Sequence, residues 1–174
     1  MKKLLAFSSI FLFAVFICGC RQPEERTYSD ADAQKIKDHA AKLWNGGDTA
    51  IVDSLYSKDC VYHNADLQDL KGREEIKNFV KWVYGVYPDF AVTLDEPMKF
   101  KDRTVITYKV TGTNKGPLGE NMPATGKKIS FTGIDICKIA DGRITEEWNS
   151  YNQLPMFRQL GYKLVPEEVK EKKK

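Results

Sequence analysis

The chain has 174 residues, of which 42% are hydrophobic and 29% charged, and its formal net charge is +3 from 27 basic and 24 acidic side chains. This length allows one folded domain, and the composition is typical of a folded protein rather than a disordered one. The charge is too small and too dispersed for a nucleic-acid-binding protein, and no internal apolar run reaches the ~20 residues that a polytopic membrane protein needs.

The N-terminal segment has the pattern of a secretory signal. Lys2 and Lys3 precede an apolar stretch at residues 4–17, which as a helix is about 21 Å long and too short to span a bilayer stably. The stretch ends in Ile17-Cys18-Gly19-Cys20, which resembles a bacterial lipobox. We therefore expect a signal peptide at 1–19, lipid on Cys20 and a tether at 20–29, so that acyl chains hold the protein at an extracytoplasmic membrane surface, facing the periplasm or the cell exterior. An ordinary secretory signal that contains cysteines is the alternative.

Three helices are predicted in the first half of the domain, which we place at residues 30–165. Ser29 or Asp30 can cap the first helix, whose apolar residues recur at helical spacing until Asn45-Gly46-Gly47. Asp48 can cap a second, shorter helix, and the β-forming residues at 59–64 predict a strand. A third helix follows Gly72 and ends near residue 88, because the residue before a proline is pushed out of the α region.

After residue 88 the hydrophobic period changes to two, which predicts strands. We expect strands near residues 90–94, 104–113, 127–139 and 143–151, with Asp141-Gly142 as a hairpin turn. A short helix at 154–160 would end at Gly161, and the charged tail at 166–174 would be solvated. The pattern predicts an α+β fold in which the helices lie on one side of a curved, mainly antiparallel sheet.

Asp135 is the only charged residue on one face of the segment 131–139 of the last-but-one predicted strand. Side chains alternate between the faces of a strand, so Asp135 shares its face with Phe131, Gly133, Cys137 and Ile139. A carboxylate on such a face loses hydration, which raises its pKa and suits it to proton transfer. The alternative is a structural aspartate that is satisfied by an arginine or by backbone N–H groups.

Several other residues are candidates for a pocket, because aromatic residues with a few polar groups are typical of small-molecule sites. His63 follows the first predicted strand and is either a donor at the pocket mouth or a surface residue. Trp148 shares a strand face with Glu146, and is either a core residue or part of a wet cavity. We predict a ligand pocket lined by Tyr108, Phe131, Trp148 and Glu146.

Signals for other chemistries are absent from the sequence. It contains no phosphate-binding glycine-rich loop and no GxSxG motif. Its two histidines lie far apart in the sequence and make a poor metal site, so we expect no metal. Cys60 and Cys137 either form a disulfide or remain separate buried thiols.

Short motifs occur in a fixed order over residues 33–161. They are Tyr62-His63-Asn64, Gly72-Arg73-Glu74-Glu75, Tyr87-Pro88-Asp89-Phe90, the runs 111–119, 122–128, 133–138 and 141–148, and Arg158-Gln159-Leu160-Gly161. Together they resemble the SnoaL-like polyketide cyclases, also called the ester cyclase family, of the NTF2-like superfamily. The resemblance implies an α+β cone with a deep apolar pocket, and often a homodimer through the outer sheet face, which would carry Ile134 and Ile136.

The resemblance also implies a reaction. The characterised cyclases close a polyketide ring by an intramolecular aldol condensation without metal or cofactor, and an acidic residue on the strand that matches Gly133-Ile134-Asp135 acts as general acid and base. That role falls on Asp135. Where relatives often carry a histidine this chain has Asn114, and where they often carry an aspartate it has Asn152.

Three functions follow as hypotheses. In the first, Asp135 moves a proton on a small apolar carbonyl compound, in a cyclisation, isomerisation or hydrolysis, while His63 and Asn114 hydrogen-bond the developing enolate oxygen. In the second, the protein is a non-catalytic lipoprotein that captures a small apolar ligand. In the third, it is a partner-binding module of the cell envelope.

Overall fold

The computed structural model describes residues 28–64, 68–163 and 165. The predicted signal peptide, the lipidation site Cys20, most of the tether and the tail at 166–174 lie outside the described residues. Within these ranges, no helix combines the length and the apolar character needed to cross a bilayer.

Three α-helices and one 3-10 turn precede most of the sheet. Helix α1 spans Asp30–Gly46, the 3-10 turn η1 spans Thr49–Ile51, helix α2 spans Val52–Leu55 and helix α3 spans Gly72–Val86. Ser29 caps α1 as predicted, in a capping box with Asp32. Gly47 ends α1 in the left-handed conformation at φ 65°, where a side chain would be strained and would also crowd the Tyr84 ring.

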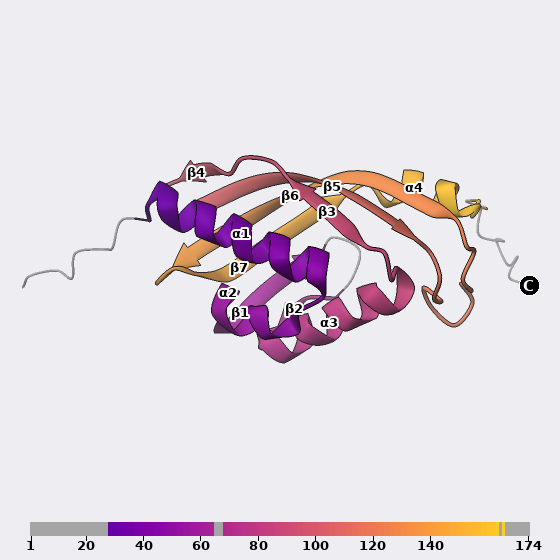
Figure 1. Ribbon diagram of the computed structural model, residues 1–174, viewed down its shortest axis with the longest axis horizontal. Helices are drawn as coiled ribbons and strands as arrows, with labels where there is room; N and C mark the ends of the chain where they lie inside the picture. The colour runs from indigo at the N-terminus through magenta and orange to yellow at the C-terminus, as the bar shows by residue number, and fades with distance from the viewer. Residues whose placement is uncertain (1–27, 65–67, 164, 166–174) are drawn as a thin grey trace, which may run out of the picture.

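The remaining chain forms one curved sheet of seven strands (Figure 1). The strands pair in the order β2-β1-β7-β6-β5-β3, with β4 added beside β5. Their bounds are β1 Tyr56–Asn64, β2 Leu70–Lys71, β3 Ala91–Leu94, β4 Met98–Phe100, β5 Arg103–Thr113, β6 Lys128–Ala140 and β7 Arg143–Tyr151. All pairs are antiparallel except β1 with β7, which is parallel.

The predicted α+β class is confirmed, with small differences at the level of elements. Asp141 and Gly142 both have positive φ, at 50° and 70°, as a tight β6–β7 hairpin turn requires. Strand β1 begins three residues earlier than predicted, at Tyr56, because α2 is only one turn long. The short strands β2 and β4 were not predicted, since two or three residues carry too little pattern to recognise. The final helix α4 covers Gln153–Leu160 and ends at Gly161.

The hydrophobic core lies between the concave face of the sheet and the helices. One buried cluster joins apolar residues of α1, α2 and α3 to β1, β6 and β7, and a second joins the end of α3 to β6 and α4. Figure 1 shows the start of α1 beside β4 at one end of the molecule and α4 at the opposite end. Cys60 and Cys137 are separate buried thiols in this core, which decides between the two alternatives.

Candidate functional site

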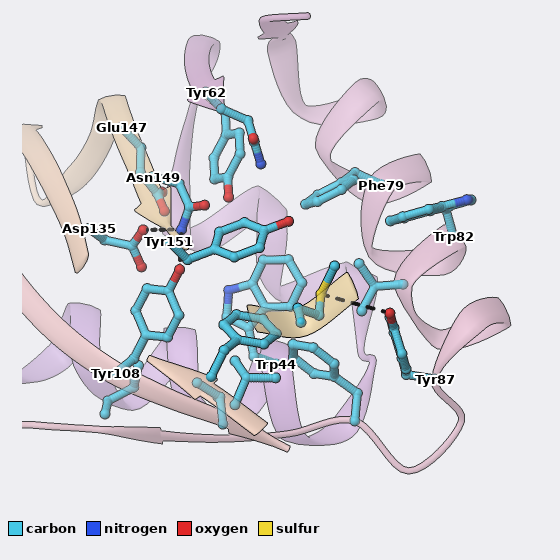
Figure 2. A pocket seen from close by; sticks show the side chains of 18 of the residues that line it. Trp44, Tyr62, Phe79, Trp82, Tyr87, Tyr108, Asp135, Glu147, Asn149 and Tyr151 are labelled. Carbon is cyan, nitrogen blue, oxygen red and sulfur yellow. Dashed lines mark hydrogen bonds between the residues drawn. The ribbon is translucent and has the colours of Figure 1, made fainter. Parts of the chain in front are cut away.

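A pocket opens into the concave side of the sheet, between the sheet and helices α1 and α3 (Figure 2). Its cavity volume is about 100 Å³, several times the roughly 10–15 Å³ that one buried water needs. Nine of its nineteen lining residues are aromatic: Trp44, Tyr62, Phe79, Trp82, Tyr87, Phe90, Tyr108, Phe131 and Tyr151. Such a wall favours a flat or apolar ligand over a strongly hydrated one.

The aromatic wall is built by contacts between distant elements. Trp44 of α1 lies 6.1 Å from Phe79 of α3 and 5.9 Å from Phe90, measured between ring centroids. On the opposite side, Phe131 of β6 stacks on Tyr151 of β7 at 4.7 Å. These pairs lock the rings against one another, so the shape of the pocket is largely fixed before a ligand arrives.

Polar groups gather at one end of the pocket. Asp135 of β6 is paired in register with Asn149 of β7, and both side chains point into the pocket. The Asn149 amide nitrogen donates to Asp135 Oδ1 at 2.6 Å and to the Tyr108 hydroxyl at 2.7 Å. The Asn149 amide of β7 therefore fixes the positions of an acid on β6 and a phenol on β5.

A second carboxyl lies at the same end. Glu147 of β7 is only 4% exposed and lines the pocket. The hydroxyl of Tyr56, in β1, donates to Glu147 Oε2 at 2.7 Å. Figure 2 shows Glu147, Asn149 and Asp135 side by side, with Tyr62 beyond them.

Burial controls the ionisation of both acids. It raises the pKa of Asp135 from 3.8 to about 7, against the opposing effect of the hydrogen bond from Asn149. Burial and the nearby charge of Asp135 raise the pKa of Glu147 well above its ordinary value, although the Tyr56 hydrogen bond opposes this. Of the described residues that line the pocket, none is Lys, Arg or His. Both carboxyls therefore resist ionisation in this pocket, and Asp135 is poised to gain or lose a proton near neutral pH.

Gly133 makes room for Tyr108. The two residues are direct partners across β5 and β6. A Cβ at position 133 would lie 2.2 Å from the Tyr108 hydroxyl oxygen, so the phenol can reach Asn149 only across a glycine.

Comparison with known proteins agrees with this architecture. Residues 34–160 match the sequence profile of the family described as SnoaL-like polyketide cyclase. The chain belongs to the SnoaL-like polyketide cyclase family. A search of curated proteins found no match.

Solved structures support the same fold. TsrD from Streptomyces laurentii superposes with a TM-score of 0.69 at 26% identity, over 76% of this chain and 97% of that one. The polyketide cyclase candidate IdmH from Streptomyces antibioticus gives 0.62 at 22% identity, over 75% and 99% of the two chains. A protein from Catenulispora acidiphila with a ketosteroid isomerase-like fold gives 0.64 at 18% identity, over 76% and 98%. The fold is therefore NTF2-like, as the sequence resemblance implied.

Three of the site residues predicted from the sequence meet in the pocket of this SnoaL-like domain. Asp135, Tyr108 and Phe131 all line it. Within the described chain, Asp135 forms no ion pair with an arginine or a lysine. Its carboxyl accepts a hydrogen bond from the Asn149 side chain. The arginine-paired structural alternative for this residue therefore does not apply.

Glu146, Trp148 and His63 lie outside the pocket, on the convex face of the sheet. The His63 ring stacks on Trp148 at 5.3 Å, and its Nε2 lies 3.1 Å from Glu146 Oε1. Its Nδ1 lies 3.0 Å from Asp69 Oδ1. Burial alone would lower the pKa of His63, but the hydrogen bonds to the two carboxylates outweigh it and raise that pKa. The guanidinium of Arg103 covers Trp148 at 5.0 Å.

The prediction that Glu146 and Trp148 line the pocket is wrong, and a β-bulge in β7 turns both side chains away from it. Lys138 pairs with Glu146 but Ile139 pairs with Ile144, so one extra residue is inserted in β7. Alternation from the buried Ile144 would place Glu146 and Trp148 inside; the bulge turns Glu147 inward instead. His63 follows the same side, because it pairs directly with Trp148.

Asn114 is a structural residue of a loop. It is completely buried and does not line the pocket. Its amide nitrogen donates to the Gly116 carbonyl at 2.7 Å, and its Oδ1 accepts from the Thr125 backbone N–H at 2.7 Å. These bonds close the loop that carries Leu118 into the pocket wall.

Sequence reasoning missed Glu147, Asn149 and Tyr56. Glu147 and Asn149 lie on the face of β7 opposite Trp148, so alternation groups them correctly. The prediction was wrong about which of the two faces points into the pocket. Tyr56 lies in a strand whose start was not recognised. Among the described residues, no group of three or more His, Cys, Asp and Glu side chains converges as a metal site would require.

Proposed function

We propose that this protein uses Asp135 as a general base and acid on a small, neutral and largely apolar carbonyl compound. The reaction is a cofactor-free cyclisation or isomerisation that begins with removal of a proton from the carbon next to the carbonyl. The observation that carries this proposal is the placement of a poised carboxyl, with a pKa of about 7, at the polar end of an aromatic pocket.

The surroundings of Asp135 support this role. A base works best when its pKa is near the working pH, and burial achieves this here. Asn149 holds one carboxylate oxygen, Oδ1, so the base is oriented. The Tyr108 hydroxyl accepts its hydrogen bond from Asn149, which leaves its own proton available for a substrate oxygen.

The experiment compares the wild type with Asp135→Asn. The full chain, purified in detergent, is incubated with a small-molecule extract of the organism that makes it, and retained compounds are identified by native mass spectrometry. Asp135→Asn should retain a compound that the wild type releases in an altered form. Asp59→Asn, at an exposed position of β1, is the matched control and should behave like the wild type.

A non-catalytic ligand-binding protein is the second candidate, because most of the pocket wall is aromatic or aliphatic and can hold a ligand without chemistry. In that case the wild type and Asp135→Asn retain the same compound, and both release it unchanged. This result would replace the enzymatic proposal.

We further propose that Cys20 carries lipid and tethers the domain to an extracytoplasmic membrane surface. The support is the sequence of the first 20 residues alone. Cys20→Ala should abolish membrane association of the mature chain, measured by fractionation, and the mass of the wild-type N-terminal peptide should show the acyl chains.

A homodimer through the convex sheet face is also proposed. Strand register places Met98, Val105, Ile136 and Trp148 in one row across β4, β5, β6 and β7. Met98 is 49% exposed, and Ile134 on the same face is 37% exposed. Ile134→Asp should convert dimer to monomer in light scattering without unfolding the domain.

A further inference from the structure

Glu147 is a buried acid that the Asp135 mechanism does not use. It lines the same pocket, and the recorded side-chain partner of its carboxyl is the Tyr56 hydroxyl. The titratable groups that face it come from β1, β5 and β6, and they are Tyr56, Cys60, Tyr62, Tyr108, Asp135 and Cys137. None of these groups is a cation, so no positively charged side chain among them pairs with the Glu147 carboxyl.

The missing cation creates a problem for a single-base mechanism. When Asp135 removes a proton from carbon, its negative charge passes to the substrate oxygen as an enolate. In a site of low polarity this oxygen needs a cation or a strong hydrogen-bond donor. No lysine, arginine or histidine occurs among the described lining residues, so the donor is a neutral group: the Tyr108 hydroxyl or a protonated carboxyl. Burial raises the pKa of Tyr108 above its ordinary value, so a carboxyl is the stronger proton donor of the two.

We propose that Glu147, in its protonated form, is the general acid that works with Asp135 in the proposed reaction. Asp135 carboxylate takes the proton from the carbon as the C–H electron pair moves into the new C=C bond. The Glu147 O–H gives its proton to the carbonyl oxygen, which yields a neutral enol. Asp135 is then the acid and Glu147 the carboxylate, so the net charge of the pair stays at −1 throughout. The pair is reset when Glu147 takes its proton back from the enol oxygen and Asp135 returns its proton to the original carbon or to a different one.

The geometry fits this division of labour. Glu147 is opposite Cys137 and Asp135 is opposite Asn149 in the β6–β7 pairing, so the two acids project from adjacent strands two positions apart. Tyr56 holds Glu147 Oε2, which leaves the other oxygen to carry and deliver the proton. Tyr56 is itself buried and is therefore a positioning residue. This inference rests on the proposed function, but it assigns the acid that function lacks.

The first test needs no substrate. Carboxyl ¹³C chemical shifts are followed against pH in the wild type, Glu147→Gln and Asp135→Asn. We expect Asp135 to ionise near neutrality and Glu147 to stay protonated until a clearly higher pH. If Glu147 ionises before Asp135, the proposal is wrong.

The second test measures proton abstraction directly. Exchange of the α-protons of 1-tetralone, a flat neutral ketone, for deuterium is followed by NMR as a function of pH. A base that must be ionised and an acid that must be protonated give a bell-shaped profile. Glu147→Gln should slow exchange by about 10²-fold or more, and it should abolish the alkaline limb because glutamine has no proton to lose.

Matched variants separate this role from a structural one. Tyr56→Phe removes a bond that lowers the pKa of Glu147, so the alkaline limb should move to higher pH. Tyr108→Phe tests the other donor and should keep the alkaline limb. Glu146→Gln changes the adjacent glutamate on the outer face and should leave the rate unchanged.

The outcomes are distinguishable. If Asp135→Asn exchanges as fast as the wild type, the proposed function fails. If Asp135→Asn is inactive but Glu147→Gln keeps both the rate and the alkaline limb, only the acid role of Glu147 fails.

Discussion

Replacing Asp135 by asparagine should make the protein more stable at neutral and alkaline pH. Burial raises the pKa of this carboxyl from 3.8 to about 7 in the folded state. Between these values the folded protein keeps a proton on Asp135 that the unfolded chain has lost, so the contribution of Asp135 to the free energy of unfolding falls as pH rises and levels off above about 7. At about 1.36 kcal/mol per pKa unit, the loss amounts to at most about 4 kcal/mol. Water that solvates the carboxylate from the pocket reduces this figure.

The assay is thermal unfolding of the wild type and Asp135→Asn between pH 4.5 and 8.5, followed by circular dichroism. The variant should gain up to roughly 10 °C in Tm over the wild type at pH 8, and the difference should shrink toward pH 4.5. A smaller slope should persist in the variant, since Glu147 is also buried. Asp59→Asn, whose carboxyl is exposed, should follow the wild-type slope. Equal slopes for the wild type and Asp135→Asn would refute the burial argument.

Three further predictions concern the supports of the site. Gly133→Ala should displace the Tyr108 ring and cost about 1–3 kcal/mol in denaturant unfolding, and an unchanged stability would show that the ring can move aside freely. Asn114→Ala should leave buried loop groups without partners and cost about 1–3 kcal/mol, with faster proteolysis of the loop as a second readout. His63 should stabilise the fold below pH 6.5 and lose this effect as pH rises through its raised pKa. His63→Gln should therefore flatten that part of the stability curve, and an unaltered curve would show that the contacts of His63 with Glu146 and Asp69 contribute nothing.

Local patterns were enough to predict most of the fold, and three of the seven residues predicted for the site line the pocket. Alternation along β6 correctly placed Asp135 and Phe131 on the inner face, because a long strand without irregularities keeps its period. On β7 a single bulge reverses the faces, and alternation cannot reveal it because the inserted residue has no signature of its own. His63 was misplaced for a different reason: its side depends on parallel pairing between β1 and β7, which are far apart in the sequence.

The charge of the pocket leads to a last prediction, on selectivity. Above pH 7 the site carries the Asp135 carboxylate, and none of the described lining residues is basic. A ligand carboxylate about 4 Å from it would be repelled by roughly 4 kcal/mol at an effective dielectric constant near 20. Methyl 2-naphthoate should therefore bind at pH 8 at least about 10²-fold more tightly than 2-naphthoate in calorimetry, and Asp135→Asn should remove most of the difference. Equal affinities for the ester and the acid in the wild type would mean that an unrecognised cation reaches the pocket, and the case for a protonated Glu147 would fall with them.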